Sequence, residues 1–121
     1  FVEGPRLRVA VEDGAAFALS AVRSAAGPRE GLYDAVLVDA YTAAGDVPEP
    51  LWTKEGDLCT ALSAGLLRRE GGLVATNFLP DVDTQPALEA YRAALAEWAP
   101  GGLGFEIQAE GTGNRLAVHT C

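Results

Sequence analysis

The sequence predicts an α/β domain with a largely parallel sheet and an antiparallel hairpin at its C-terminal end, arranged as a three-layer sandwich. Short runs of strand-forming residues alternate with segments of helical composition, in the order β-α-β-α-β-α-β-β. The central runs lack the polar and apolar alternation of a half-buried strand. Such continuous runs are typical of parallel strands covered on both faces.

Length and composition limit the chain to one soluble domain. It has 121 residues, of which 49% are hydrophobic and 21% charged. No apolar run is long enough to span a bilayer, so we expect no membrane insertion. The net charge of −8, from 17 acids against 9 bases, leaves no basic surface for nucleic acid and suits a cationic substrate or a basic partner.

The first expected unit is a strand, an acidic turn and a helix. Residues 7–11 combine small and β-branched side chains and end before Glu12, Asp13 and Gly14. Residues 15–26 have a helix-forming composition, and a Gly-Pro pair follows them.

The second expected unit is a strand, a long loop, a helix and another strand. The strand "YDAVLVD" (33–39) leads into a loop with two prolines at 40–50. A helix is expected from Thr53 or Asp57 to Arg69, closed by a Gly-Gly pair. The run "LVATNF" (73–78) is the next strand.

The last expected unit is a helix followed by a hairpin. Pro86 suits a first helical turn, and the helix shows apolar residues at helical spacing up to Trp98. Two short strands flank the turn residues 111–114, which are typical of a hairpin. No internal repeat or low-complexity linker is present.

Polar residues fall where the expected strands end. In open α/β sheets ligands bind beyond the carboxyl ends of the strands. Asp13 follows the first strand, Asp39 ends the second, and Asn77 lies near the end of the third. Asp13 either caps the next helix or contacts a ligand. For Asp39 capping is disfavoured, because the next helix begins more than ten residues later.

The stretches "RLRVAVEDGAAFAL", "YDAVLVDAY" and "LWTKEGDLCTALSAGLLRREGGLVATNF" resemble the C-terminal part of the Rossmann-like core of spermidine synthases and related class I S-adenosylmethionine-dependent methyltransferases. "GNRLAVHT" is similar to the final strand of that family. The resemblance implies that residues 1–121 are a single partial domain, core strands 3 to 7 of a seven-stranded Rossmann-like sheet. The glycine-rich cofactor loop of the family is absent, so we expect this stretch to be inactive alone.

The resemblance assigns roles to several residues. The acid after the third core strand, Asp13, would accept a hydrogen bond from the adenine amino group of the cofactor, next to Glu12. Gly14 would let the adenine approach the backbone. Asp39 would hold or deprotonate the attacking amine. Tyr41 either lines the substrate pocket or packs, and Thr42 is a second candidate for substrate binding.

The family usually carries a second acid three residues after the first, and Thr42 stands at that position. This departure favours methyl transfer over aminopropyl transfer. The expected function is transfer of a methyl or aminopropyl group from S-adenosylmethionine, or its decarboxylated form, to a small-molecule or protein amine. The alternative is a non-catalytic member of the fold that serves dimerisation or partner binding.

Other reactive residues form no recognisable motif. Cys59 and Cys121 lie far apart without a nearby His, which disfavours a zinc site or a disulfide framework. His119 has no nucleophile motif near any serine or cysteine, so a structural or an exposed histidine is expected. Asp81 and Asp83 fit no calcium loop, and we expect no metal.

The N-terminal end begins at Phe1 without a signal-like stretch, and we interpret the chain as a piece of a longer protein. An intracellular, cytoplasmic location is the expectation. The oligomeric state stays open, with a homodimer among the alternatives.

Overall fold

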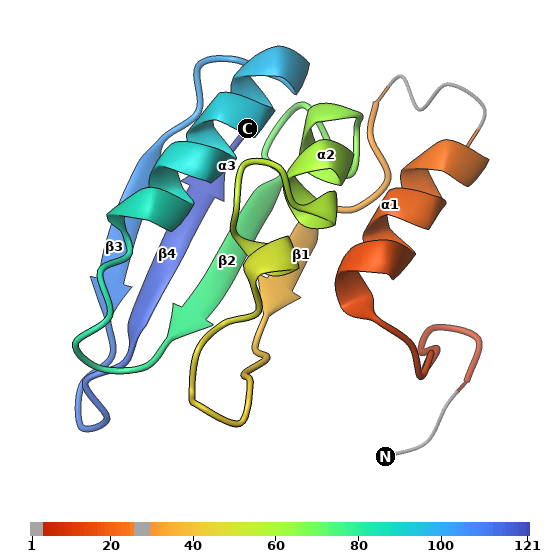
Figure 1. The fold of residues 1–121 in the computed structure, drawn as a ribbon. Helices are drawn as coiled ribbons and strands as arrows, with labels where there is room; N and C mark the ends of the chain where they lie inside the picture. The colour runs from red at the N-terminus through yellow and green to blue at the C-terminus, as the bar shows by residue number, and fades with distance from the viewer. Residues whose placement is uncertain (1–3, 26–29) are drawn as a thin grey trace.

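A computed structural model describes residues 4–25 and 30–121 (Figure 1). None of the described helices is long and apolar enough to cross a membrane. In chain order the elements are α1 (Gly14–Ser24), β1 (Ala35–Val38), the 3-10 turn η1 (Glu49–Leu51), α2 (Asp57–Ser63), β2 (Leu73–Phe78), α3 (Gln85–Trp98), β3 (Gly104–Gln108) and β4 (Arg115–Thr120).

The strands form one mixed sheet in the order β1-β2-β4-β3. β1 pairs with β2 in parallel, whereas β4 is antiparallel to both β2 and β3. Three strands therefore run in one direction and β4 runs against them. The α/β class and the C-terminal hairpin are confirmed, and the antiparallel strand lies inside the sheet while β3 forms the edge.

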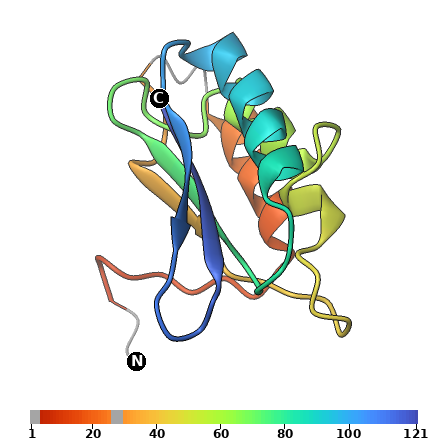
Figure 2. The same ribbon diagram turned by 90° about the vertical axis from the view of Figure 1, so that its left-hand side faces the viewer.

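All three described helices lie on one face of the sheet (Figure 2). Their apolar side chains pack on the inward residues of β2, of which Val74 and Thr76 are fully buried. Leu62 of α2 and Leu95 of α3 belong to the same core. The described residues thus make two layers, and the second helical layer of the expected sandwich is not among them.

The opposite face of the sheet is apolar and open. Side chains of ladder partners point to the same face, so Leu37, which pairs with Ala75, lies on the face away from the helices. Leu37 is 75% exposed, and Phe105 and Ile107 of β3 are also exposed. The strands have the sequence pattern of strands covered on both faces, so their outward positions are apolar. These apolar side chains are exposed because no described helix covers that face.

The strand predicted at residues 7–11 is not formed. Leu7 makes a single bridge to Gly4, and residues 8–11 belong to no strand. Val11 is 98% exposed. The composition favours a strand, but a strand also needs a continuous ladder with a neighbouring segment, and no such ladder is formed here.

Two of the expected helices end earlier than predicted. α2 ends at Ser63 rather than Arg69 because Gly65 takes a positive φ of 106°, which turns the chain out of the helix. α1 ends at Ser24, and the Gly-Pro pair expected to stop it lies outside the described residues.

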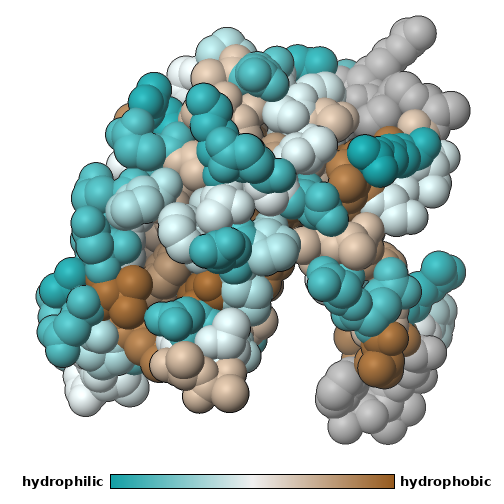
Figure 3. Space-filling view, in the orientation of Figure 1, coloured by the Kyte–Doolittle hydropathy of each residue, from teal (hydrophilic) through white to brown (hydrophobic). Residues whose placement is uncertain are grey.

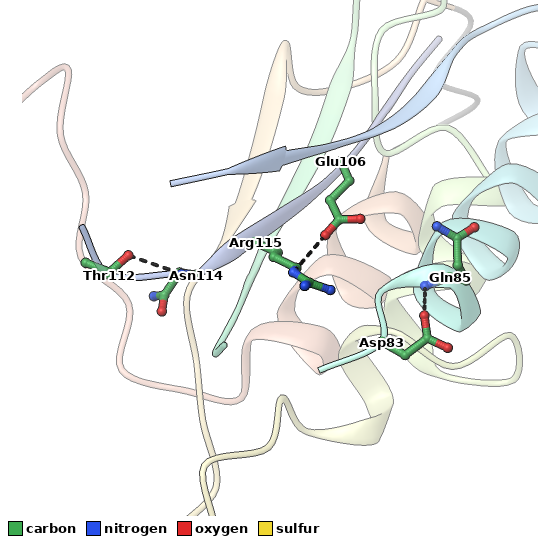
Figure 4. A network of polar contacts seen from close by, with 6 residues as sticks. All are labelled: Asp83, Gln85, Glu106, Thr112, Asn114 and Arg115. Carbon is green, nitrogen blue, oxygen red and sulfur yellow. Dashed lines mark hydrogen bonds and ion pairs between the residues drawn. The ribbon is translucent and has the colours of Figure 1, made fainter. Parts of the chain in front are cut away.

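The start of α3 is fixed by a side chain of the preceding loop. The carboxylate of Asp83 accepts a hydrogen bond from the backbone N–H of Gln85 at 3.0 Å (Figure 4). This bond pairs one of the N–H groups that a helix N-terminus leaves without a partner. Asp83, which fits no calcium loop in the sequence, therefore has a structural role at the start of α3.

The hairpin is held by polar contacts as well as by its ladder. Arg115 pairs with Glu106 across the two strands at 3.2 Å, and the Thr112 hydroxyl accepts from the N–H of Asn114 at 3.2 Å (Figure 4). These contacts fix the turn where the sequence predicted it.

Tyr91 joins three elements through its hydroxyl group. It is fully buried in α3, donates to the carbonyl of Leu51 at 2.8 Å and lies 2.6 Å from the hydroxyl of Thr76. Because the Tyr91 proton is used towards Leu51, Thr76 donates to Tyr91. Burial raises the pKa of the Tyr91 hydroxyl well above its usual range, so the group stays neutral.

Replacing Tyr91 by Phe tests this junction. Tyr91→Phe leaves the Leu51 carbonyl and the buried Thr76 hydroxyl without their partner, and we expect it to lower the free energy of unfolding by about 1–3 kcal/mol. Urea denaturation followed by circular dichroism measures the change. Tyr33→Phe is the matched control, because that ring is 40% exposed. Equal stability of both variants would contradict the assignment.

Candidate functional site

The candidate site lies at the carboxyl ends of the two parallel strands. Val38 of β1 is paired with Thr76 of β2, so the next residues, Asp39 and Asn77, come side by side. The Asn77 side-chain amide donates to a carboxylate oxygen of Asp39 at 3.3 Å. The parallel pairing therefore brings together two polar groups that are 38 positions apart in the chain.

Tyr41 completes what we call the Asp39 cluster, namely Asp39, Tyr41 and Asn77. Its hydroxyl donates to the backbone carbonyl of Asn77 at 3.1 Å and lies near the Asp39 carboxylate. Partial burial and then the negative charge of Asp39 raise the pKa of Tyr41. Tyr41 is thus a neutral hydrogen-bond donor beside an acid.

Asp13 is the N-cap of α1. Its carboxylate accepts from the N–H of Ala16 at 3.1 Å, and its backbone carbonyl accepts from Phe17 at 2.9 Å. The capping prediction is therefore confirmed. The side chain is exposed, and one carboxylate oxygen is engaged with the helix.

Gly14 and Glu12 flank this cap in different surroundings. Gly14 is the first residue of α1, and a Cβ built on it would meet no atom within 4 Å. Its backbone is therefore open to a ligand. Glu12 is exposed, and its carboxylate has no ion pair with another residue of the described chain.

A cavity of about 720 Å³ lies between β1, α1 and the N-terminal segment, and we call it the edge cavity. Gly14 and Asp39 both line it, whereas Asp13, Glu12 and Tyr41 do not. In the space-filling view the N-terminal segment stands apart from the body of the molecule across an open gap (Figure 3). Further lining residues are Arg6, Arg8, Phe17, Tyr33 and Leu58.

A smaller cavity of about 330 Å³, the loop cavity, lies between the loop after β1 and the start of α3. Thr42 lines it together with apolar residues and three acids, Asp46, Glu49 and Asp83. The Thr42 hydroxyl accepts from the N–H of Asp46 at 3.3 Å and so holds the turn of the loop.

The structure therefore separates some of the predicted site residues. Gly14 and Asp39 share the edge cavity, and Thr42 belongs to the loop cavity. Tyr41 lines neither and instead anchors the loop to β2. Sequence reasoning missed Arg6 and Arg8 as lining residues, because no motif distinguishes them and only the path of the N-terminal segment brings them to β1.

The remaining reactive residues have structural environments. His119 is 4% exposed and its Nδ1 lies 2.9 Å from the carbonyl of Thr120. Both cysteines are free. Within the described ranges, no three His, Cys, Asp or Glu side chains gather in a way that could hold a metal ion.

No protein-family model, no curated protein and no solved structure matches the chain. The site offers a carboxylate held by an amide in the lining of a cavity, with open glycine backbone in the same cavity.

The Asp39 cluster makes a prediction for the titration of Tyr41. Asp39→Asn removes the negative charge that opposes formation of the phenolate, so the pKa of Tyr41 should fall towards its ordinary value, while partial burial keeps it from returning completely. Nuclear magnetic resonance of ¹³C-labelled tyrosine against pH measures it, with Tyr41→Phe to assign the signal. Asp46→Asn is the control and should leave the titration unchanged. An unaltered pKa in Asp39→Asn would place the carboxylate elsewhere.

The two thiols should differ in reactivity. Cys59 is buried, and burial together with the charge of Glu55 raises its pKa to about 11, whereas Cys121 is half-buried with a pKa also raised by burial. Because the thiolate is the reactive form, a disulfide reagent at about pH 8 should modify Cys121 in the native protein and Cys59 only after unfolding. Cys121→Ser should abolish the native reaction. Equal rates for both thiols would contradict the burial of Cys59.

Proposed function

We propose that the chain contributes to a transferase of the spermidine synthase-like, S-adenosylmethionine-dependent type, which moves a methyl or aminopropyl group from a sulfonium nucleoside to an amine. The observation that carries the proposal is the shared cavity. Asp39, beyond the carboxyl end of β1, and Gly14, at the start of α1, line the same volume of about 720 Å³. Ligands of open α/β sheets bind in such a crevice.

The edge cavity fits a nucleoside in size and in lining. Its volume lies within the range of about 300–1,000 Å³ that is usual for small-molecule sites. Phe17 and Tyr33 offer aromatic surface, and the unobstructed Gly14 leaves room for a flat ring against the backbone. Asp13, one residue away, would contact the adenine amino group with the carboxylate oxygen that the helix does not use.

When bound, a sulfonium nucleoside supplies a carbon that an amine nitrogen attacks, with the sulfur leaving as a thioether. Asp39 would orient the amine and accept the proton that its nitrogen loses. Asn77 holds one oxygen of Asp39 at 3.3 Å and leaves the other for the amine. A carboxylate and an ammonium 4 Å apart attract each other by about 1 kcal/mol in water and about 4 kcal/mol near a protein surface.

Methyl transfer is favoured over aminopropyl transfer. A diamine acceptor needs a second anion for its distal ammonium, and Thr42 offers only a hydroxyl that already accepts from Asp46. Thr42 also lines the loop cavity rather than the edge cavity that contains Asp39.

A non-catalytic role is the second candidate, and a specific observation favours it. Asp39 and Tyr41 both contact Asn77, so the cluster also anchors the loop after β1 to the neighbouring strand. In this alternative Asp39 only holds the loop, and the sheet serves dimerisation or partner binding.

Calorimetric titration of the full-length protein with S-adenosylmethionine and its decarboxylated form tests the proposal. Asp13→Ser keeps an N-cap residue for α1 but removes the carboxylate, so the dissociation constant should rise at least about tenfold if Asp13 holds the adenine. Asp83→Ser is the matched control, because Asp83 also bonds a helix N-terminus but lies outside the edge cavity. Equal affinities for both variants would refute the adenine role.

Asp39→Asn separates catalysis from binding. With 1,4-diaminobutane and a lysine-containing peptide as acceptors, the transfer rate should fall about 10²–10⁴-fold while cofactor affinity stays unchanged, because a base acts on the amine and not on the nucleoside. If the wild-type protein binds neither cofactor, the transferase proposal fails.

A further inference from the structure

The loop cavity is separate from the site that the transferase proposal uses. All of its lining residues come from the segments 42–52 and 78–87, and neither Asp39 nor Gly14 is among them. No described residue lines both the loop cavity and the edge cavity. The loop cavity therefore depends neither on the β1 edge nor on the open face of the sheet.

The walls of the loop cavity are apolar. Val47, Phe78 and Ala87 line it and are at most 5% exposed. The indole of Trp52 forms part of the wall, and its N–H donates to the carbonyl of Val47 at 2.9 Å, which holds the ring in place. The volume of about 330 Å³ lies at the lower end of the range of about 300–1,000 Å³ that is usual for small-molecule sites. The cavity therefore suits a ligand with a short apolar stem.

Three carboxylates also line this cavity, those of Asp46, Glu49 and Asp83, and all three residues are exposed. No Lys, Arg or His in ranges 4–25 and 30–121 lines it, and none of the three acids forms an ion pair with another described residue. A cleft lined by one sign of charge raises the local concentration of oppositely charged ligands. The loop cavity thus combines apolar walls with exposed negative charge.

The geometry favours an organic cation over a metal ion. In the part of the chain that the structure describes, no three His, Cys, Asp or Glu side chains gather closely enough to hold a metal ion. An ammonium group on a methylene stem needs no such convergence, because the stem packs on apolar surface while the charged head stays near water and the acids. Trp52 adds to this preference, since tryptophan is the aromatic side chain that attracts cations most strongly.

We propose that the loop cavity binds a primary alkylammonium group, with its methylene stem against Val47 and Trp52 and its charged head near the three carboxylates. This chemistry is shared by free aliphatic amines and by the lysine side chains of proteins. The proposal is independent of the transferase. The reacting amine of that proposal lies at Asp39 in the edge cavity, so the ammonium bound in the loop cavity is not the group that reacts.

The test titrates ¹⁵N-labelled full-length protein with n-butylammonium chloride and follows the amide shifts. We expect saturable shifts in residues 45–49 and 82–87 and in the indole N–H of Trp52. As controls that leave the protein unchanged, n-butanol has the same stem without the charge, and ammonium chloride has the charge without the stem. At equal ionic strength each should bind at least about tenfold more weakly than n-butylammonium.

Isosteric variants test the role of the carboxylates. The double variant Asp46→Asn, Glu49→Gln removes two negative charges and should weaken binding of n-butylammonium at least about tenfold. Asp83 stays unchanged because its carboxylate also bonds the start of α3. The control variant Glu70→Gln, Glu97→Gln changes the net charge equally at two exposed positions outside the cavity. Its affinity for n-butylammonium should stay within about twofold of the wild-type value.

Two further ligands separate the sources of the ammonium group. The peptide acetyl-Ala-Ala-Lys-Ala-Ala-amide presents a lysine side chain, and 1,4-diaminobutane is a free aliphatic amine. Tighter binding of the peptide assigns the site to a lysine of a protein, and tighter binding of the diamine assigns it to a free amine. Either order agrees with the proposal.

Three outcomes would overturn the proposal. They are an absence of saturable shifts in residues 45–49 and 82–87, equal binding of n-butanol, and an equal loss of affinity in the control variant. Shifts confined to residues 35–39 would also overturn it, because the amine would then bind in the edge cavity. Failure of cofactor binding leaves the proposal intact, and failure of the amine titration leaves the transferase proposal intact, because the two cavities share no described lining residue.

Discussion

The buried hydroxyl of Tyr91 is the contact on which the arrangement of this protein depends. It accepts from Thr76 on β2 and donates to Leu51 in the turn η1, so one side chain of α3 binds both the sheet and the long loop before α2. A buried hydroxyl must be paired, because an unpaired one costs about 1–3 kcal/mol. The position of the loop relative to the carboxyl end of β2 is thereby fixed, and with it the wall of the loop cavity.

The same loop is fixed at its beginning by the Asp39 cluster and in its middle by Trp52, whose indole N–H donates to the carbonyl of Val47 at 2.9 Å. This long connection, which contains the short turn η1, is ordered by hydrogen bonds of side chains. The polar residues at the strand ends therefore have two roles in the structure, since Asp39 lines a cavity and also anchors the loop. Asp13 caps α1 and does not itself line the edge cavity, but its neighbour Gly14 does.

The exposed surfaces follow from the same sequence pattern that builds the core. β1 is apolar on both faces and carries no protective charge at its edge, so it has the composition of an interior strand while it lies at the edge of the described sheet. Because interior-type strands lie at the surface of the described sheet, the outward positions of β1 and β3 are apolar and the edge cavity lies beside β1. Burial of further polypeptide against these surfaces would be favourable, at roughly 25 cal/mol for each Å² of apolar area removed from water.

By itself, the sequence determined the elements whose signals are local. The run 73–78 was predicted as a strand with the observed bounds, the hairpin turn follows from Gly and Asn at 111–114, and the cap of α1 follows from Asp13. The α/β class follows from the alternation of these elements. Their local signals suffice because backbone preferences and side-chain periodicity act within a few residues.

Only the tertiary structure decided which of these elements pair and which polar groups meet. Residues 7–11 have a strand composition but form no strand, since a strand also requires a continuous ladder with another segment. Distant segments also decide that Asp39 meets Asn77. They place Tyr41 and Thr42 in different surroundings, and they bring Arg6 and Arg8 close to β1. Such contacts are set by the packing of the whole chain, because no local preference encodes which remote segment will lie alongside.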